Sequence, residues 1–337
     1  MSVLLVDGDN LLTIGFYGVK NYFFKGNHIG GIYHFLNTLR RSFETYNLDK
    51  IVVFWDGENA SQTRRNFYNH YKENRKSRLR TEEELDSYNN QRNRIKQYLE
   101  ELYVRQGEYM ECESDDCVAY YVKNSPKEYK IIYSSDRDLI QLISENTKLY
   151  NPMHAKLYSS GDLIEYDHET IIVENVKLLK ILCGDPSDNI YGIKSLGVKK
   201  LLNLFPELKT QKSSLSEVKE KFNVLFEGDK HNKTIQNLLT GVTKLGVFGE
   251  EFFIINEKIV DLNNPMLTED AKKNITDLIK ESLDPEGRSY KNCMKMMMED
   301  GLFTVLPKQN DAWINFLNPF LRLTIKEKNK KKIKFKI

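Results

Sequence analysis

The sequence predicts an α/β fold in which a mainly parallel sheet is flanked by helices. The prediction depends on three segments of the 337-residue chain, residues 2–10, 50–59 and 129–143. Each is an apolar run that ends in acidic or small polar residues, as a buried strand does where it leaves a sheet. Strands that alternate with helices form parallel sheets, which bind ligands at the carboxyl ends of their strands. We therefore expect the acids after these segments to meet at one edge.

The first connecting helix is expected at residues 30–46, where apolar side chains recur at helical spacing. A charged insertion, residues 57–105, then separates two strands. Between Arg64 and Arg80 it holds seven Arg or Lys residues and one acid. A helix there would carry four of its side chains on one face, Tyr68, Tyr71, Arg75 and Arg78.

The later elements are mainly helical. Residues 81–102 predict a solvated helix that begins with a Thr-x-x-Glu capping box. Residues 171–205 indicate a helix, an acidic loop, a glycine turn and a second helix, and another helix could begin at Pro186 in that loop. Residues 207–337 continue as helices and end in a tail with seven Lys after Thr324.

Composition bounds the class of protein. The chain is 40% hydrophobic and 29% charged, with a net charge of only +2, which is typical of a globular protein with a charge-rich surface. No apolar run approaches the roughly 18 residues of a membrane span, and the N-terminus lacks the basic region of a secretory signal. The four cysteines form no C-x-x-C pair, so free thiols in a reducing cytoplasm are expected.

Acidic residues recur where strands end and helices begin. The stretch ECESDD alone places three carboxylates within four positions before an apolar run. Helix capping explains any one such acid, and Asp-Gly and SSDRDL are also ordinary turn and cap sequences. Several acidic groups at one edge would instead need divalent cations, and oxygen ligands favour Mg²⁺ or Mn²⁺. The candidate ligands are Asp7, Asp56, Glu113, Asp115, Asp116, Asp136, Asp138, Asp185 and Asp188.

Two basic segments could hold a nucleic acid. The Tyr-bearing basic insertion suits a phosphate backbone and unpaired bases, although a charged run is usually a solvated face. Beside an acidic metal pocket, Lys72 and Arg75 could polarise a scissile phosphate. In GIKSLGVKK the glycines bracket a turn before a helix, where backbone N–H groups can approach a phosphate. The segment lacks the G-K-[ST] ending of a P-loop.

Six motifs closely resemble the structure-specific 5′ nucleases, the flap endonucleases and the 5′→3′ exonuclease domains of bacterial DNA polymerases. They are VDGDN, FWDG, YKENR, ECESDD, SSDRDLIQL and GDPSDNIYGIKSLGVKKL, in family order across residues 3–205. A looser likeness beyond residue 250 is to the T-even phage ribonuclease H. The resemblance implies a PIN-like α/β domain at residues 1–170 with a helical arch at 57–105. It also implies a helical DNA-binding domain at 171–325, a helix-hairpin-helix (H3TH) element at 185–205, and a separate tail at 326–337.

The resemblance also implies residue roles. The family's first metal site is matched by Asp7, Asp56, Glu113, Asp115 and Asp136. The second metal site is matched by Asp138, Asp185 and Asp188, and a further family acid by Asp116. Tyr71, Lys72 and Arg75 match the catalytic arch pattern, in which Glu73 replaces a residue that is often smaller. The expected DNA contacts are Arg64, Arg65, Arg78, Gly192, Lys194, Gly197, Val198, Lys199 and Lys200. A monovalent cation such as K⁺ is expected at the hairpin element.

The expected function is hydrolysis of phosphodiester bonds near 5′ ends, with two Mg²⁺ (or Mn²⁺) per site. The implied substrates are DNA with a 5′ flap, nick or gap, and RNA primers in RNA–DNA hybrids. The alternatives are a PIN-type endoribonuclease and a non-catalytic protein that binds DNA junctions. The resemblance further implies a cytoplasmic, nucleoid-associated monomer that could meet a sliding clamp or a single-strand-binding protein. The Lys-rich tail could add DNA affinity, pair with such a partner as an edge strand, or stay solvated.

Overall fold

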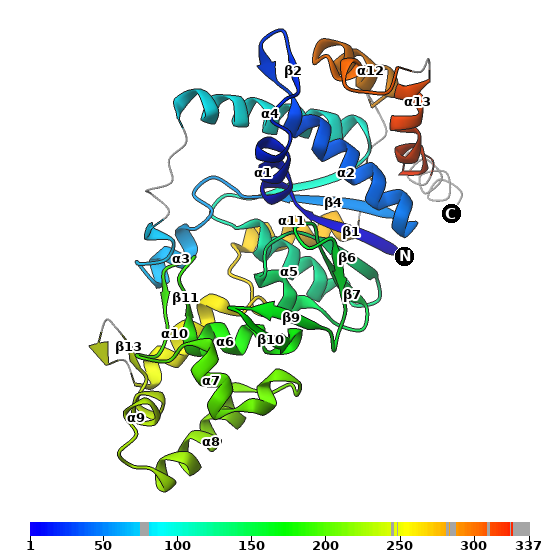
Figure 1. Cartoon of the computed structure of the whole chain (residues 1–337). Helices are drawn as coiled ribbons and strands as arrows, with labels where there is room; N and C mark the ends of the chain where they lie inside the picture. Colours follow the sequence, from blue (N-terminus) through cyan, green and yellow to red (C-terminus); the bar gives the residue numbers. More distant parts are fainter. Residues whose placement is uncertain are drawn as a thin grey trace.

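A six-stranded, mainly parallel sheet forms the centre of the molecule (Figure 1). The computed structural model describes residues 1–74, 81–243, 246–247, 249–280, 283, 288–308, 311–323 and 325. In spatial order the strands are β5 (Arg105–Glu108), β4 (Lys50–Trp55), β1 (Ser2–Asp7), β6 (Tyr129–Tyr133), β7 (Thr147–Asn151) and β8 (Lys156–Tyr158). All neighbours are parallel except β7 and β8. The predicted fold class is confirmed.

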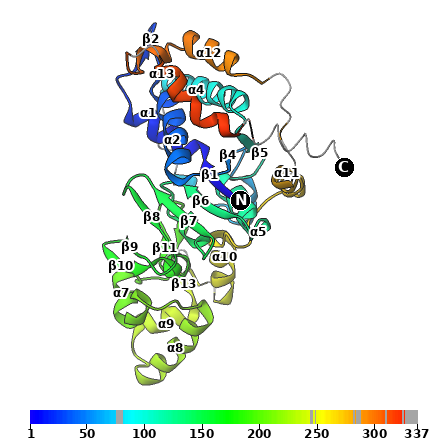
Figure 2. The ribbon, with the colours of Figure 1, turned by 90° about the vertical axis from the view of Figure 1, so that its right-hand side faces the viewer.

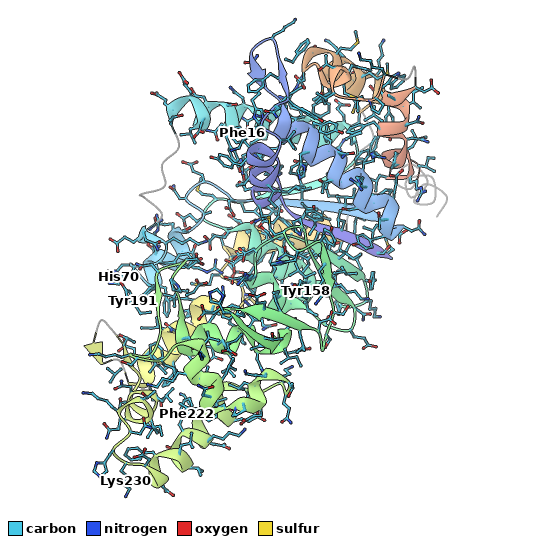
Figure 3. The ribbon with its side chains drawn as sticks, viewed as in Figure 1. Phe16, His70, Tyr158, Tyr191, Phe222 and Lys230 are labelled. Carbon is cyan, nitrogen blue, oxygen red and sulfur yellow. The ribbon has the colours of Figure 1, made fainter. Side chains whose placement is uncertain are left out.

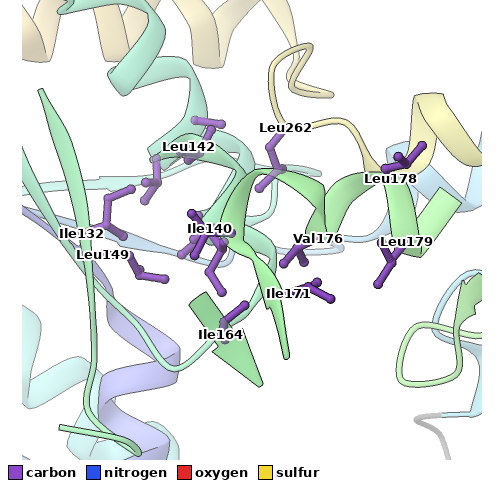
Figure 4. Packing of buried hydrophobic residues seen from close by; sticks show 14 of the residues in the cluster. Ile132, Ile140, Leu142, Leu149, Ile164, Ile171, Val176, Leu178, Leu179 and Leu262 are labelled. Atoms are coloured by element: carbon purple, nitrogen blue, oxygen red, sulfur yellow. The ribbon is translucent and has the colours of Figure 1, made fainter. Parts of the chain in front are cut away.

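The central strand is buried on both faces, which explains its continuous apolar run. Val3 and Leu5 join one hydrophobic cluster, whereas Leu4 and Val6 join the other. Successive side chains of a strand point to opposite faces, so a strand covered on both sides needs apolar residues throughout. Figure 4 shows part of the hydrophobic cluster that contains Val3 and Leu5, where side chains of β6 and β7 meet Ile140 and residues that follow the sheet.

Helices cover both faces of the sheet. One face is covered by α1 (Gly8–Gly18), α2 (Gly30–Tyr46), α4 (Glu82–Glu101), α12 (Tyr290–Glu299) and α13 (Ala312–Leu317). The other is covered by α5 (Ser114–Asn124), α6 (Val176–Cys183) and α11 (Glu269–Lys280). The C-terminal helices thus return to the N-terminal sheet. The predicted division at residue 170 remains a prediction.

A helical region extends away from the sheet, at the opposite end from α12 and α13 (Figures 1 and 2). Its helices are α7 (Val198–Leu204), α8 (Leu215–Gly228), α9 (Lys233–Thr240) and α10 (Glu250–Val260). Short antiparallel pairs complete the fold, namely β2 (Phe23–Phe24) with β3 (Asn27–His28), β9 (Leu163–Tyr166) with β10 (Glu169–Ile172), β11 (Gly184–Asp185) with β12 (Ile190–Tyr191), and β13 (Val242–Thr243) with β14 (Gly246–Val247). No helix among the described residues is long and apolar enough to cross a membrane.

The insertion differs from its prediction. Its first helix, α3 (Gln62–Phe67), ends before Tyr71, which is buried in turns at 2% exposure. The expected Tyr-bearing face therefore does not form, and Arg75 and Arg78 lie outside the described residues. The second helix, α4, begins at the Thr81 cap, which accepts from Glu84 N at 3.2 Å. It is not fully solvated, because it buries Tyr88, Gln91, Ile95, Tyr98 and Leu99 against the core.

The acidic loop also differs from its prediction. The segment at Pro186 turns between β11 and β12 and does not begin a helix. The backbone at Gly184 has φ +81°, a conformation that favours glycine, and this allows the tight pairing with β12. The Lys-rich tail at 326–337 lies outside the described residues. All four cysteines are free, as predicted.

Candidate active site

Three acids converge at the carboxyl ends of neighbouring strands. Asp7 ends β1, Asp56 follows β4, and Asp136 follows β6. Ser114, the first residue of α5, links two of them: its Oγ donates to Asp7 Oδ1 at 3.1 Å and its N–H to Asp56 Oδ1 at 2.8 Å. Burial first, and then the charges of Asp56 and Asp136, raise the pKa of Asp7 well above its ordinary value. The predicted convergence is therefore present in the structure.

A first acidic cluster, defined as Glu113, Asp115 and Asp116, lies at the start of α5. Its ligand oxygens lie within 4.8 Å of one another, so they could hold a metal ion. Glu113 occupies the N-cap position, but its side chain makes no capping hydrogen bond. It accepts instead from Ser61 Oγ at 2.7 Å and from Lys72 Nζ at 2.5 Å. Capping therefore does not explain this acid.

Arg64 compensates part of the negative charge of the first cluster from within. Its guanidinium donates to both oxygens of Asp116, at 2.6 and 3.0 Å, and also to Glu113. The residue is 4% exposed, and its Nε donates to Ile259 O at 3.3 Å. Although burial opposes it, the charges of Arg64 and Lys72 hold the pKa of Glu113 well below its ordinary value. The expectation that Arg64 contacts DNA is wrong, because its guanidinium is buried and paired with carboxylates.

Tyr71 connects the first cluster to a second. Its hydroxyl lies 2.9 Å from Glu113 Oε2 and 3.4 Å from Asp188 Oδ2. The next residue, Lys72, has φ +54° and donates its backbone N–H to Asp188 O at 2.9 Å. The structure therefore places Tyr71 and Lys72, both predicted to belong to an arch, between the two clusters. Arg65 is half-buried and donates to Tyr71 O at 3.2 Å.

The second acidic cluster, defined as Asp138, Asp185 and Asp188, also has ligand oxygens within 4.8 Å of one another. Lys180 on α6 donates to Asp138 and, at 2.6 Å, to Asp185 Oδ2. Although burial opposes it, the charge of Lys180 lowers the pKa of Asp185. Sequence reasoning missed this lysine, and its only signal was a single charge within the apolar stretch LLKILC.

The turn at residues 68–74 docks onto the β11–β12 hairpin, which carries Asp185 and Asp188. Asn189 donates to His70 O at 2.8 Å, and Asn74 donates to Pro186 O at 3.0 Å. The rings of His70 and Tyr191 meet edge to face with centroids 6.3 Å apart (Figure 3). This docking fixes Tyr71 and Lys72 relative to both clusters.

Asp9 and Arg92 form a further ion pair, which could not be predicted from the sequence. Arg92, on α4, donates to the two Asp9 oxygens at 2.7 and 3.0 Å and to Asp56 O at 2.8 Å. Their separation of 83 residues left no local signal. The pair ties the second helix of the insertion to the ends of β1 and β4.

The DNA contacts that were predicted in the helix-hairpin-helix element include both exposed and buried residues. Lys194, Gly197, Lys199 and Lys200 are exposed around the turn before α7, whereas Val198 is buried. Gly192 packs tightly, since an added Cβ would lie 2.0 Å from the Cys183 carbonyl. A cavity of about 610 Å³ separates this turn from the second cluster; its walls include Asp136, Arg137, Lys180, Asp185 and Gly197.

Comparison with known proteins identifies the family. The family model described as 5′-3′ exonuclease, N-terminal resolvase-like domain, matches residues 2–174, about half of the chain. The chain belongs to this family and is a nuclease. It is similar to the 5′-3′ exonuclease of Mycoplasmopsis pulmonis, with 28% identity over 294 residues that cover 85% of this chain and 91% of that one. It is also similar to the 5′-3′ exonuclease of Halalkalibacterium halodurans, with 29% identity over 65% and 74% of the two chains.

The fold has a similar relative among solved structures. The T5 5′-exonuclease with bound divalent metal ions (zinc) superposes with a TM-score of 0.64 and 21% identity, covering 83% of this chain and 98% of that one. This confirms the predicted 5′ nuclease resemblance at the level of fold. The first acidic cluster and Asp138 lie within the residues that the family model covers, whereas Asp185 and Asp188 lie beyond them, in the β11–β12 hairpin that follows α6.

Proposed function

We propose that the protein is a Mg²⁺-dependent 5′ nuclease. It would hydrolyse phosphodiester bonds near the 5′ ends of DNA at flaps, nicks and gaps, and in RNA primers of RNA–DNA hybrids. The observation that carries the proposal is the meeting of two carboxylate clusters joined by Tyr71. A similar T5 flap endonuclease has been solved as a pseudo-enzyme-product complex with DNA and metal ions, which supports DNA and a divalent cation as ligands.

The donor set fits Mg²⁺ or Mn²⁺, because it consists of carboxylate oxygens without thiolate or imidazole. Glu113 and Asp115 would hold one ion together with the strand-end acids Asp7, Asp56 and Asp136, and the second cluster would hold the other. Asp116 is better assigned to positioning, since both of its oxygens accept from Arg64 and one also accepts from Met266 N. When bound, two such ions stabilise the attacking and leaving oxygens of a phosphodiester displacement.

The chain's own residues would orient the substrate. The Lys72 ammonium lies beside Glu113 and is placed to attract a phosphate at the first cluster. Lys194, Lys199 and Lys200 form an exposed basic group that suits a duplex backbone. The expected K⁺ would bind at the turn at Gly192–Gly197, where backbone carbonyls would supply its ligands.

The decisive test is cleavage of 5′-labelled nicked and flapped duplexes with Mg²⁺, Mn²⁺ or EDTA. We expect cleavage only with the cations, and loss of cleavage with retained DNA binding in Asp136→Asn. A wild-type protein that binds junctions without cutting them would be a binding protein. A protein that prefers single-stranded RNA to either duplex would be an endoribonuclease.

Partners and location are part of the same proposal. A nucleoid-associated monomer that meets a sliding clamp or a single-strand-binding protein would fit a nuclease acting at replication junctions. Deleting residues 326–337 tests the tail: a shallower dependence of DNA affinity on salt would assign it to DNA, because each lost phosphate contact reduces that slope by about one.

A further inference from the structure

Lys180 places a positive charge inside the second cluster, a feature that the proposed function does not use. The residue is 5% exposed. Its ammonium donates to Asp185 Oδ2 at 2.6 Å and to Asp138 Oδ1. Removing an ammonium from water costs free energy that only close carboxylates offset. In the protein without metal, Lys180 therefore supplies part of the counter-charge that the three crowded carboxylates require.

Lys180 and a divalent cation need the same oxygens. Asp185 Oδ1 already accepts from Ser187 N at 2.9 Å and from Ser187 Oγ at 2.6 Å. The oxygen of Asp185 that remains for an ion is Oδ2, which Lys180 holds. An ammonium and a divalent cation that share one carboxylate repel each other. Cation binding at the second cluster therefore requires Lys180 to withdraw.

The two clusters differ in how firmly their internal cation is held. Arg64 is fixed by the planar fork that donates to Asp116 and Glu113 and by its bond to Ile259 O. Lys180 is a single ammonium on a flexible four-carbon stem. It lines the cavity of about 610 Å³ beside the second cluster, which gives the ammonium space to move.

We propose that Lys180 is an internal competitor of the cation at the second cluster. It keeps Asp138 and Asp185 neutralised in the absence of metal, and it raises the cation concentration at which this cluster fills. The inference deepens the proposed metal-dependent function and rests on it. The first ion would also have the strand-end acids Asp7, Asp56 and Asp136 as ligands, which offset the charges of Arg64 and Lys72. We therefore expect the first cluster to fill before the second as the cation concentration rises.

The test compares Lys180→Met with the wild-type full chain, using Mn²⁺ alone as the probe and no DNA. Counting free Mn²⁺ by electron paramagnetic resonance, we expect the weaker class of sites to bind about tenfold more tightly in the variant. We also expect a lower melting temperature in EDTA that Mn²⁺ restores. Lys177→Met is the matched control: it removes a Lys177–Asp261 pair at 3.0 Å one turn earlier on α6, and should leave Mn²⁺ binding unchanged.

Unchanged or weaker Mn²⁺ binding in Lys180→Met would overturn the competition. So would a melting temperature that Mn²⁺ fails to restore, since a purely structural lysine would be missed equally with and without metal. If Lys180→Met does not fold in EDTA, Lys180→Gln gives the same comparison with a hydrogen-bonding side chain. Wild-type protein that binds Mn²⁺ but leaves nicked duplex uncut would contradict the proposed function. If the wild-type protein cuts nicked duplex but Lys180→Met binds Mn²⁺ with unchanged affinity, only the proposed competition would be contradicted.

Discussion

At the residue scale, Arg64 and Arg65 are neighbours with opposite environments. Arg64 is buried between Asp116 and Glu113, whereas Arg65 is half-buried and donates one bond to a backbone carbonyl. Removing one partner of a buried ion pair leaves the other charge without compensation. We expect Arg64→Met to lower the free energy of unfolding by about 3–5 kcal/mol in EDTA, and Arg65→Met by about 1 kcal/mol. Urea denaturation measures both, and equal losses would show that Arg64 is not the structural charge described above.

The acids of the site were predictable, whereas of their cationic partners only Lys72 was expected beside them. Asp7, Asp56 and Asp136 follow apolar strands, so a local pattern already indicated a shared edge. Lys180 reaches Asp138 across 42 residues of sequence, and Arg92 reaches Asp9 across 83. Which cation meets which carboxylate is decided by tertiary packing, and no local spacing carries that information.

At the element scale, the β11–β12 hairpin carries two of the three acids of the second cluster, Asp185 and Asp188, and two glycines near it provide a matched test. An alanine Cβ at Gly192 would lie 2.0 Å from the Cys183 carbonyl, whereas at Gly197 it would have no atom within 4 Å. Overpacking against backbone costs about 1–3 kcal/mol or more. We expect Gly192→Ala to lower the melting temperature and cleavage together, and Gly197→Ala to keep the wild-type melting temperature. Circular dichroism melts with a cleavage assay check this, and a stable, active Gly192→Ala would contradict the close approach.

The elements that were mispredicted share one cause. The helix α4 is rich in charge, which indicated a solvated helix, yet Tyr88, Ile95 and Tyr98 form a narrow buried stripe at spacings of seven and three. The Pro186 loop has good signals for a helix start, but the pairing of Gly184 with Tyr191 takes precedence. Tertiary contacts overrode local propensity in both, whereas the buried strands, whose pattern reflects those contacts directly, were predicted correctly.

At the scale of the whole molecule, the site concentrates negative charge where strands, helices and the hairpin meet, although the chain's net charge is only +2. Both clusters contain an internal cation, which compensates only part of that charge. Folding without metal therefore has an electrostatic cost that depends on pH. Proton uptake and cation binding become alternative ways to reduce the same repulsion.

We therefore expect the metal-free protein to be more stable at pH 5.5 than at pH 7.5. Burial raises the pKa of Asp7 and Asp115 well above the ordinary value, and that of Asp116 to about 6. A carboxyl with a higher pKa when folded binds protons preferentially in the folded state, so the free energy of unfolding falls as pH rises through this range. Burial also raises the pKa of Asp56. Burial lowers the pKa of His34, which acts in the opposite sense, but it is one group against four.

The groups with depressed pKa do not reverse this expectation. Glu113 and Asp185 contribute stability above their unfolded pKa values, and that contribution is lost only at pH below about 4. Melting temperatures measured in EDTA between pH 5.5 and 7.5 should therefore fall with rising pH. In saturating Mn²⁺ the slope should flatten or change sign, because protons then compete with the cation for the same oxygens. A melting temperature that rises with pH in EDTA would mean that the carboxylates are already fully compensated by Arg64, Lys72 and Lys180.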